Sequence, residues 1–280
     1  MDHGADLPGK WRLHVGTVRS KVFDNISPDE RILTERRGNI LFITINRPDV
    51  RNAFDARSAR EMHFAMDRLD NDDDLFVGVI TGAGGNFSAG ADLKSIARGE
   101  TRSTDRGGFG MMKRPSRKPL IAAVEGYALG GGFELCLSCD LVVASRSAKF
   151  GLPEVRHNVV AVGGGLIRLH RRIPYHLAME MALTGEFRDA TWMAGLGLVN
   201  RVVDEGKALD EAEALANRLL VNGPTALAAS KEIIFLSSSW TEEEAWNRQV
   251  PIADVALESE DRNEGLKAFA EKRRPVWQGR

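Results

Sequence analysis

Cysteine is nearly absent from this 280-residue chain, which contains only Cys136 and Cys139. A secreted disulfide scaffold needs more cysteines. A thioredoxin-type redox pair belongs at an exposed helix start, whereas this C-x-x-C lies inside an apolar stretch. A zinc site would need a second cysteine pair or nearby histidines. The two residues are therefore interpreted as buried free thiols, as expected in a reducing cytoplasm.

An excess of charge of either sign is also missing. The chain has 38 Lys and Arg against 39 Asp and Glu, so its net charge is −1, which excludes a strongly basic nucleic-acid-binding protein. No apolar run reaches the ~20 residues of a membrane helix, because Glu125, Glu134 and Asp140 interrupt the best candidate. The N-terminal residues contain no apolar signal-peptide core. We expect a cytoplasmic globular protein that binds neither nucleic acid nor membrane.

Short apolar segments alternate with amphipathic ones, a pattern that predicts an α/β fold. A helix is predicted over residues 56–70, where Met62, Ala65, Met66 and Leu69 recur at helical spacing. Segments rich in β-branched residues predict strands, the first two paired across the Arg37-Gly38 turn. The predicted strands cover residues 31–35, 39–46, 75–81, 120–124, 141–144 and 198–203.

The ends of the chain differ from this middle part. Residues 1–28 lack clear periodicity and are predicted to form an extension outside the main fold, followed by the α/β core over residues 29–208. Residues 209–280 are predicted to be helical. They include an amphipathic segment over residues 209–220, a capping box formed by Thr241 and Glu244, and a further helix over residues 264–273.

Three glycine-rich segments, at residues 81–85, 88–92 and 130–132, fit no nucleotide-binding or serine-hydrolase motif. The segment Gly130–Gly132 lies between a predicted strand and a predicted helix. Its backbone N–H groups are therefore expected to lack helical partners at the positive end of the helix dipole. Because glycine has no Cβ, an oxygen atom of a ligand can approach this backbone closely.

Two acidic residues and one basic run are further candidates. Glu134 follows Gly130–Gly132 within about one helical turn, and Glu154 follows Pro153. Each also has a purely structural interpretation. Glu134 could be an acid that stabilises the helix start, and Glu154 could be a solvated carboxylate in a loop. The basic run over residues 113–118 is typical of an exposed loop, and binding of a phosphate-bearing ligand is the alternative.

Three longer motifs occur in order: NRPDVRNAF at residues 46–54, FSAGADL at residues 87–93, and GYALGGGFEL followed by CD at residues 126–140. With them the chain resembles the enoyl-CoA hydratase (crotonase) superfamily from about residue 30 to its C-terminus. The resemblance implies a crotonase-like α/β spiral of ββα units with a C-terminal helical trimerisation region. It also implies a homotrimer or homohexamer.

The same resemblance implies an acyl-CoA substrate whose thioester oxygen accepts hydrogen bonds from the backbone N–H groups of Ala91 and Gly131. Glu134 and Glu154 match the two hydratase glutamates. Hydration needs one group to activate water and another to deliver a proton to the α-carbon, so both carboxylates have a function. Coenzyme A enters as part of the substrate, and neither a metal nor a redox cofactor is implied.

The resemblance also assigns positions to the coenzyme A moiety. Phe269 and Lys272 match positions that approach the coenzyme A of a neighbouring subunit. The positions that line the coenzyme A within one subunit are Arg51, Ala53, Ala89, Asp92 and Leu93.

The expected activity is enoyl-CoA hydration, a lyase reaction. The alternatives are an enoyl-CoA isomerase and a hydratase or dehydratase of an unusual acyl-CoA such as a carnitine-type substrate. His157, Asn158 and Ala161 replace a leucine, a glycine and a proline of many hydratases, which leaves the acyl group open. The closing segment FAEKRRPVWQGR also resembles the tail of carnitinyl-CoA dehydratases.

Overall fold

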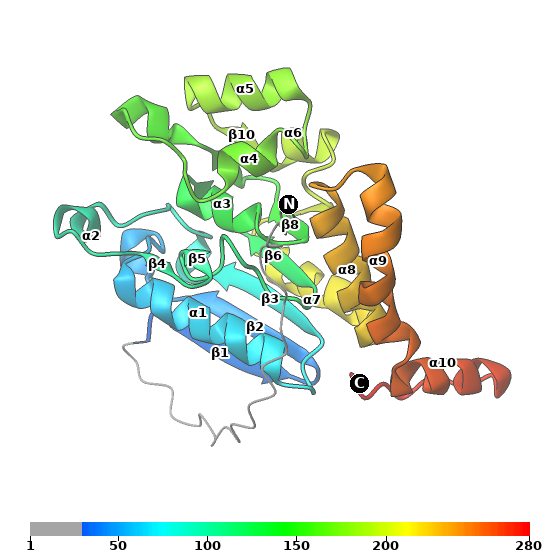
Figure 1. The fold of residues 1–280 in the computed structure, drawn as a ribbon. Helices are drawn as coiled ribbons and strands as arrows, with labels where there is room; N and C mark the ends of the chain where they lie inside the picture. The colour runs from blue at the N-terminus through cyan, green and yellow to red at the C-terminus, as the bar shows by residue number, and fades with distance from the viewer. Residues whose placement is uncertain (1–29) are drawn as a thin grey trace.

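The computed structural model describes residues 30–280, so the predicted extension over residues 1–28 lies outside the described residues. A six-stranded sheet runs through the molecule (Figure 1). Its strands, in spatial order, are β1 (Ile32–Arg37), β2 (Ile40–Ile45), β3 (Val77–Gly82), β6 (Leu120–Val124), β8 (Leu141–Ser145) and β11 (Arg201–Val203). β1 and β2 are antiparallel, and the other neighbouring strands are parallel.

The predicted strands are confirmed, with shifts of up to three residues in their bounds. The β1–β2 hairpin turns at Gly38, whose φ of +59° favours glycine. The strand predicted over residues 198–203 begins only at Arg201, because Leu198 and Val199 lie in the connection that follows α6 (Ala190–Gly195).

Successive side chains of a strand point to opposite faces of the sheet. Here both faces are buried, each in its own apolar core. Leu41 and Ile43 belong to one core together with Met62 and Met66 of α1 (Ala56–Asn71), the helix predicted over residues 56–70. Ile40 and Phe42 of the same strand belong to a second core with α7 (Ala208–Leu219). The predicted C-terminal region over residues 209–280 includes most of α7, although α7 packs on this central sheet. The domain division stays a prediction.

A smaller sheet has the order β10 (Arg188–Asp189), β9 (Lys149–Gly151), β7 (Tyr127–Leu129). β7 and β9 are parallel, so the segments that follow them emerge side by side. Those segments carry Gly130–Gly132 and Glu154. A two-stranded ribbon, β4 (Ser103–Thr104) and β5 (Gly107–Gly108), lies near α1.

The remaining helices of the α/β part are short. α3 starts at Gly131, two residues before the predicted helix start at about Phe133. α4, α5 and α6 lie together above α3 in Figure 1. The bounds are α2 (Leu93–Ala97), α3 (Gly131–Cys136), α4 (Gly165–Leu169) and α5 (Tyr175–Thr184), with 3₁₀-helices η1 (Pro48–Val50), η2 (Ala83–Gly85) and η3 (Pro153–His157).

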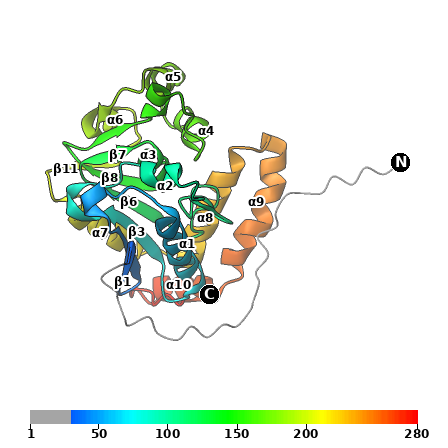
Figure 2. The ribbon, with the colours of Figure 1, turned by 90° about the vertical axis from the view of Figure 1, so that its left-hand side faces the viewer.

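The chain ends in three helices, α8 (Pro224–Ser237), α9 (Glu242–Leu257) and α10 (Glu260–Ala270). α8 and α9 lie side by side at one edge of the molecule, and α10 lies below them (Figures 1 and 2). The predicted capping box of Thr241 and Glu244 is confirmed at the start of α9. α10 begins earlier than predicted because Ser259 caps it, accepting a hydrogen bond from Arg262 N. In residues 30–280 no single helix is long and apolar enough to cross a membrane, while α7 and α8 pass that test as a pair bent by 106°.

Two local predictions have opposite outcomes. Cys136 and Cys139 are buried free thiols, as predicted, and burial raises the pKa of Cys139 to about 12. The exposed loop predicted for residues 113–118 is wrong for its second half. Ser116 is buried and donates to Asp70 at 2.7 Å, and Lys118 Nζ donates to the carbonyl of Asp72 at 2.7 Å. Hydrogen bonds to the carboxylate of Asp70 and the carbonyl of Asp72, at the end of α1, hold this half of the segment against the protein.

Candidate active site

Three segments that carry the three sequence motifs lie side by side. Ala89 N donates to the carbonyl of Arg51 at 2.9 Å, and Phe54 N donates to that of Gly90 at 2.8 Å. On the other side, Leu129 N donates to the carbonyl of Ser88 at 3.0 Å. The glycine-rich segment 88–92 is therefore held between residues 51–54 and 127–131, and motifs that are far apart in the chain form one site.

Two backbone N–H groups of this site are free. In the described part of the chain, neither Ala91 N nor Gly131 N donates a hydrogen bond. The two segments approach closely, since a Cβ built on Gly90 would lie 3.1 Å from Gly131 N. Gly131 is the first residue of α3, where a helix leaves its N–H groups without partners. Two such donors at one place can bind a developing oxyanion.

Glu134 lies on α3, one turn beyond Gly131, and is 4% exposed. Its Oε1 accepts a hydrogen bond from Gly165 N at 2.8 Å, where α4 begins. Burial raises the pKa of Glu134, against the opposing effect of amide bonds and of the Arg168 charge. Arg168 also donates to the carbonyl of Met112 at 2.5 Å and to Ser138 Oγ at 3.1 Å. The Glu134 side chain is thus fixed by elements on several sides.

Glu154 lies at the start of η3, directly after Pro153. Its Oε1 would lie 3.0 Å from a Cβ built on Gly130, so the carboxylate stands against the turn that opens α3. Its Oε2 is buried and has no hydrogen-bond partner among the described residues. Burial raises the pKa of Glu154 to about 7, and the charge of Glu134 adds to this shift. A buried carboxyl oxygen without a partner, with a pKa near neutrality, is suited to proton transfer.

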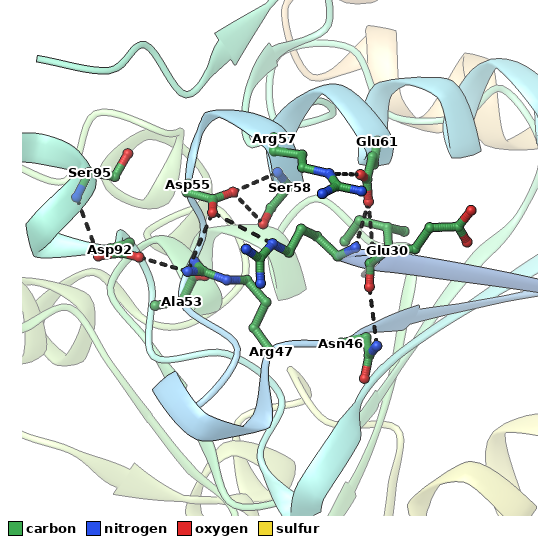
Figure 3. A network of polar contacts seen from close by, with 12 residues as sticks. Glu30, Asn46, Arg47, Ala53, Asp55, Arg57, Ser58, Glu61, Asp92 and Ser95 are labelled. Carbon is green, nitrogen blue, oxygen red and sulfur yellow. Dashed lines mark hydrogen bonds and ion pairs between the residues drawn. The ribbon is translucent and has the colours of Figure 1, made fainter. Parts of the chain in front are cut away.

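An ion-pair network holds Ala53 and Asp92, two of the residues predicted to line coenzyme A (Figure 3). Arg47 donates to the carbonyl of Ala53 at 2.5 Å and to Asp92 at 3.0 Å, and it pairs with Asp55 at 3.4 Å. Asp92 also caps α2, accepting from Lys94 N at 2.9 Å. In the sequence, Arg47 stands out only as part of the NRP motif, two residues after the strand β2.

The other predicted coenzyme A residues divide into two groups. Arg51 and Leu93 are exposed beside the free amides, and Ala89 links to Arg51 through its N–H group. Phe269, which is 87% exposed, and Lys272 lie at the end of α10. In both ribbon views α10 is well separated from α3 (Figures 1 and 2). These two residues are therefore not part of the site of their own chain.

Two apolar residues that sequence analysis missed also reach the site. The ring of Phe109 packs on Gly131, because a Cβ built there would lie 2.5 Å from Phe109 Cε2. Met112 Sδ lies against Gly163, and a Cβ on that glycine would lie 2.5 Å from Glu134 Oε2. Both residues come from the irregular segment DRGGFGMM, which has no periodicity that could have revealed them.

A cavity of about 1160 Å³ lies beyond Gly163, between α4 and α8. Neither Glu134 nor Glu154 lines it, but its lining residue Gly163 lies directly against the Glu134 carboxylate. Residues 30–280 contain no group of three or more His, Cys, Asp or Glu side chains placed to hold a metal ion.

Comparison with known proteins identifies the family of the chain. The family model described as enoyl-CoA hydratase/isomerase matches residues 35–280, which is most of the chain. The chain belongs to this family. The match covers the site segments and the C-terminal helices together.

Individual relatives agree over nearly their full length. An enoyl-CoA hydratase of Mycobacterium tuberculosis is 41% identical over 256 residues, covering 89% of this chain and 96% of the relative. A carnitinyl-CoA dehydratase of Escherichia coli is 42% identical over 263 residues, covering 90% and 99%. The crystal structure of an enoyl-CoA hydratase from Mycobacterium tuberculosis superimposes with a TM-score of 0.88 at 50% identity, covering 90% of this chain and all of that one. The crotonase-like α/β fold predicted from the motifs is confirmed.

Proposed function

We propose that this protein is an enoyl-CoA hydratase, a lyase that adds water across the double bond of a 2-enoyl-CoA thioester. The observation that carries the proposal is the placement of two carboxylates, the buried Glu134 and the half-buried Glu154, beside the free N–H groups of Ala91 and Gly131. The M. tuberculosis hydratase that is 41% identical supports the same activity.

The two amides act on the thioester. Its carbonyl oxygen accepts hydrogen bonds from Ala91 N and Gly131 N, and negative charge gathers on that oxygen as water attacks the β-carbon. Donors already fixed by the backbone stabilise this enolate-like state without having to reorganise. Losing one oxyanion donor in a comparable site costs about 10²–10³ in rate.

The two carboxylates move protons. Glu134 holds and activates the attacking water, for which it must be ionised. Glu154 delivers a proton to the α-carbon, for which it must be protonated, and its pKa of about 7 keeps a large protonated fraction at neutral pH. Together they give addition of water with no need for a metal or redox cofactor, because coenzyme A enters as part of the substrate.

Substrate binding and assembly follow the same reasoning. Arg51, Ala53, Ala89, Asp92 and Leu93 would contact coenzyme A beside the amides. Phe269 and Lys272 would contact the coenzyme A of a neighbouring subunit, which requires a homotrimer or homohexamer. The exposure of Phe269 supports this. The two free buried thiols support a cytoplasmic location.

Hydration or dehydration of a carnitine-type acyl-CoA is a second candidate, favoured by the E. coli carnitinyl-CoA dehydratase that is 42% identical. The isomerase alternative is less favoured, because both hydratase glutamates are present and face one site.

A hydration assay over a panel of acyl-CoA substrates tests the proposal. Loss of the conjugated enoyl absorbance is followed for crotonyl-CoA, longer straight 2-enoyl-CoA thioesters and crotonobetainyl-CoA, and a 3-enoyl-CoA tests for isomerisation. We expect hydration of the straight-chain thioesters. Activity on crotonobetainyl-CoA alone would replace the proposal with the carnitine-type function, and conversion of the 3-enoyl-CoA alone would replace it with isomerisation.

A further inference from the structure

One loop, residues 105–113, runs along the reacting centre. Its Phe109 ring packs on Gly131, a proposed donor to the thioester oxygen. Its Met112 packs on Gly163, beside Glu134, which acts at the β-carbon. Two points of the loop therefore lie beside the groups that act on the carbonyl and on the β-carbon of the acyl group, and the α-carbon lies between these two atoms.

Phe109 has an unusual backbone conformation for a bulky residue. Its φ is +50°, and its ring is only 6% exposed. The ring stacks on that of Phe54 with centroids 4.4 Å apart and planes 1° from parallel. Phe54 in turn brackets Ala91, accepting from Asp92 N at 2.9 Å and donating to Gly90 O at 2.8 Å. A backbone in this region persists only when its surroundings hold it, so the ring is fixed against Gly131 and against Phe54, whose backbone flanks Ala91.

Arg106 holds the loop in place. Its buried guanidinium donates to Asp67 at 2.7 Å and to Asp70 at 2.6 Å, both on α1. Its carbonyl accepts from Lys113 N at 2.9 Å and from Arg114 N at 3.0 Å, which closes the loop. Gly110 lies directly against the carbonyl of Ala59 on α1. The loop cannot move outward without leaving a buried ion pair incomplete, which is strongly unfavourable.

We propose that Phe109 determines acyl specificity by restricting the substrate to thioesters unbranched at the α-carbon, with Arg106 as the residue that positions it. The inference rests on the proposed function, since it takes Gly131 and Glu134 as the reacting centre. A methyl group on the α-carbon lies next to the carbonyl that Gly131 binds. There it would clash with the edge of the Phe109 ring, which its packing on Phe54 and the Arg106 ion pairs hold in place.

The test compares crotonyl-CoA with 2-methylcrotonyl-CoA as substrates. The measured quantity is the ratio of kcat/KM for the branched substrate to that for the unbranched one. Phe109→Ala should raise this ratio on the order of 10–200-fold, the range for removing a steric limit of about one methyl group. Phe64→Ala is the matched control, because Phe64 lies on α1 and is 66% exposed, and it should leave the ratio unchanged.

Two further variants separate specificity from folding. Phe109→Leu preserves an apolar side chain and should raise the ratio in the same direction by a smaller factor. Arg106→Lys keeps the charge but loses the planar fork that reaches both aspartates, so the loop loosens and the ratio rises. A merely structural role of Arg106 would reduce kcat/KM equally for both substrates and leave the ratio unchanged.

An unchanged ratio in folded Phe109→Ala and Phe109→Leu would overturn the inference. If the wild-type enzyme hydrates neither thioester, the proposed function fails, and specificity is then decided by calorimetry with butyryl-CoA and 2-methylbutyryl-CoA. In that measurement Phe109→Ala should gain affinity for the branched thioester relative to the unbranched one. Equal affinities in wild type and variant would overturn the inference independently of catalysis.

Discussion

Glu134 and Glu154 belong to one electrostatic unit: burial raises the pKa of Glu154 to about 7, and the charge of Glu134 contributes to that shift. The two residues come from α3 and η3, which are joined where Gly130 N donates to the carbonyl of Gly151 at 2.9 Å. Because the Glu154 pKa lies near neutrality, this carboxyl group can either donate or accept a proton under ordinary conditions.

The first prediction concerns pH. Glu154 is protonated below about pH 7 and ionised above it. If it donates the α-proton, kcat/KM for hydration should fall as pH rises through about 7. The kcat/KM for the reverse dehydration should fall in parallel, because the overall reaction takes up no proton and both directions use the carboxylate pair with one proton. On the acid side, hydration should fall as Glu134 becomes protonated, at a pH above the ordinary 4.5 because burial raises its pKa. Measuring kcat/KM against pH for hydration and for dehydration checks these expectations. A limb near pH 7 that persists in Glu154→Gln would assign it to another group.

The second prediction concerns removal of each carboxylate. Glu134→Gln and Glu154→Gln should each reduce hydration on the order of 10²–10⁴-fold, the range for losing a positioned acid or base. Glutamine keeps the shape but exchanges no proton at neutral pH. The double variant should be little worse than the poorer single one, because groups that act as a unit are not additive.

Isotope exchange separates the two roles within the same variants. Glu154→Gln should slow α-proton exchange on a saturated acyl-CoA more than Glu134→Gln does. Near-normal hydration after either single change would show that this glutamate is only a helix-start or loop acid, and the isomerase alternative would then be preferred.

The third prediction concerns the Arg47 network. The Arg47 side chain is only 10% exposed between Asp55 and Asp92, so Arg47→Met removes the cation that two buried carboxylates share. The free energy of unfolding should fall by roughly 3–5 kcal/mol, measured by denaturant titration. Arg36→Met is the control, since Arg36 pairs with Asp74 on the surface and an exposed pair is worth about 0–1 kcal/mol. Equal losses in both variants would argue against the network as an anchor of the site.

The fourth prediction concerns ligand recognition. Acyl-CoA thioesters should bind, whereas the corresponding free acids should not, because the free amides and the residues around Asp92 are placed for a thioester with its coenzyme A. Isothermal titration calorimetry with butyryl-CoA and butyrate provides the comparison. Similar affinities for the two ligands would contradict the proposed substrate class.

The fifth prediction concerns assembly. Light scattering should give the mass of a trimer or hexamer at micromolar concentration. Lys272→Ala and Phe269→Ala should raise KM for the acyl-CoA, because these side chains reach a site only across a subunit boundary. Lys267→Ala, on the exposed face of the same helix, is the matched control. A stable monomer that hydrates its substrate normally would rule out this role for α10.

The sequence by itself determined the elements and the chemistry-bearing motifs, for reasons that are local. Apolar spacing every three to four residues in 56–70 selects a helix, the β-branched run ILFITI selects a strand, and Thr241 with Glu244 marks a helix start. The glycine-rich motifs pointed to Ala91, Gly131, Glu134 and Glu154 because close backbone approach and helix starts have recognisable residue patterns.

Tertiary structure alone decided what surrounds these residues. The parallel pairing of β7 with β9 brings Glu154 to Gly130, and burial by both chain segments then raises its pKa. Three contacts join residues that no local pattern relates. Ser116 donates a hydrogen bond to Asp70, the ring of Phe54 stacks on that of Phe109, and Arg106 pairs with Asp70 on α1. Such contacts depend on three-dimensional packing between distant segments, and neither periodicity nor motif spacing encodes that packing.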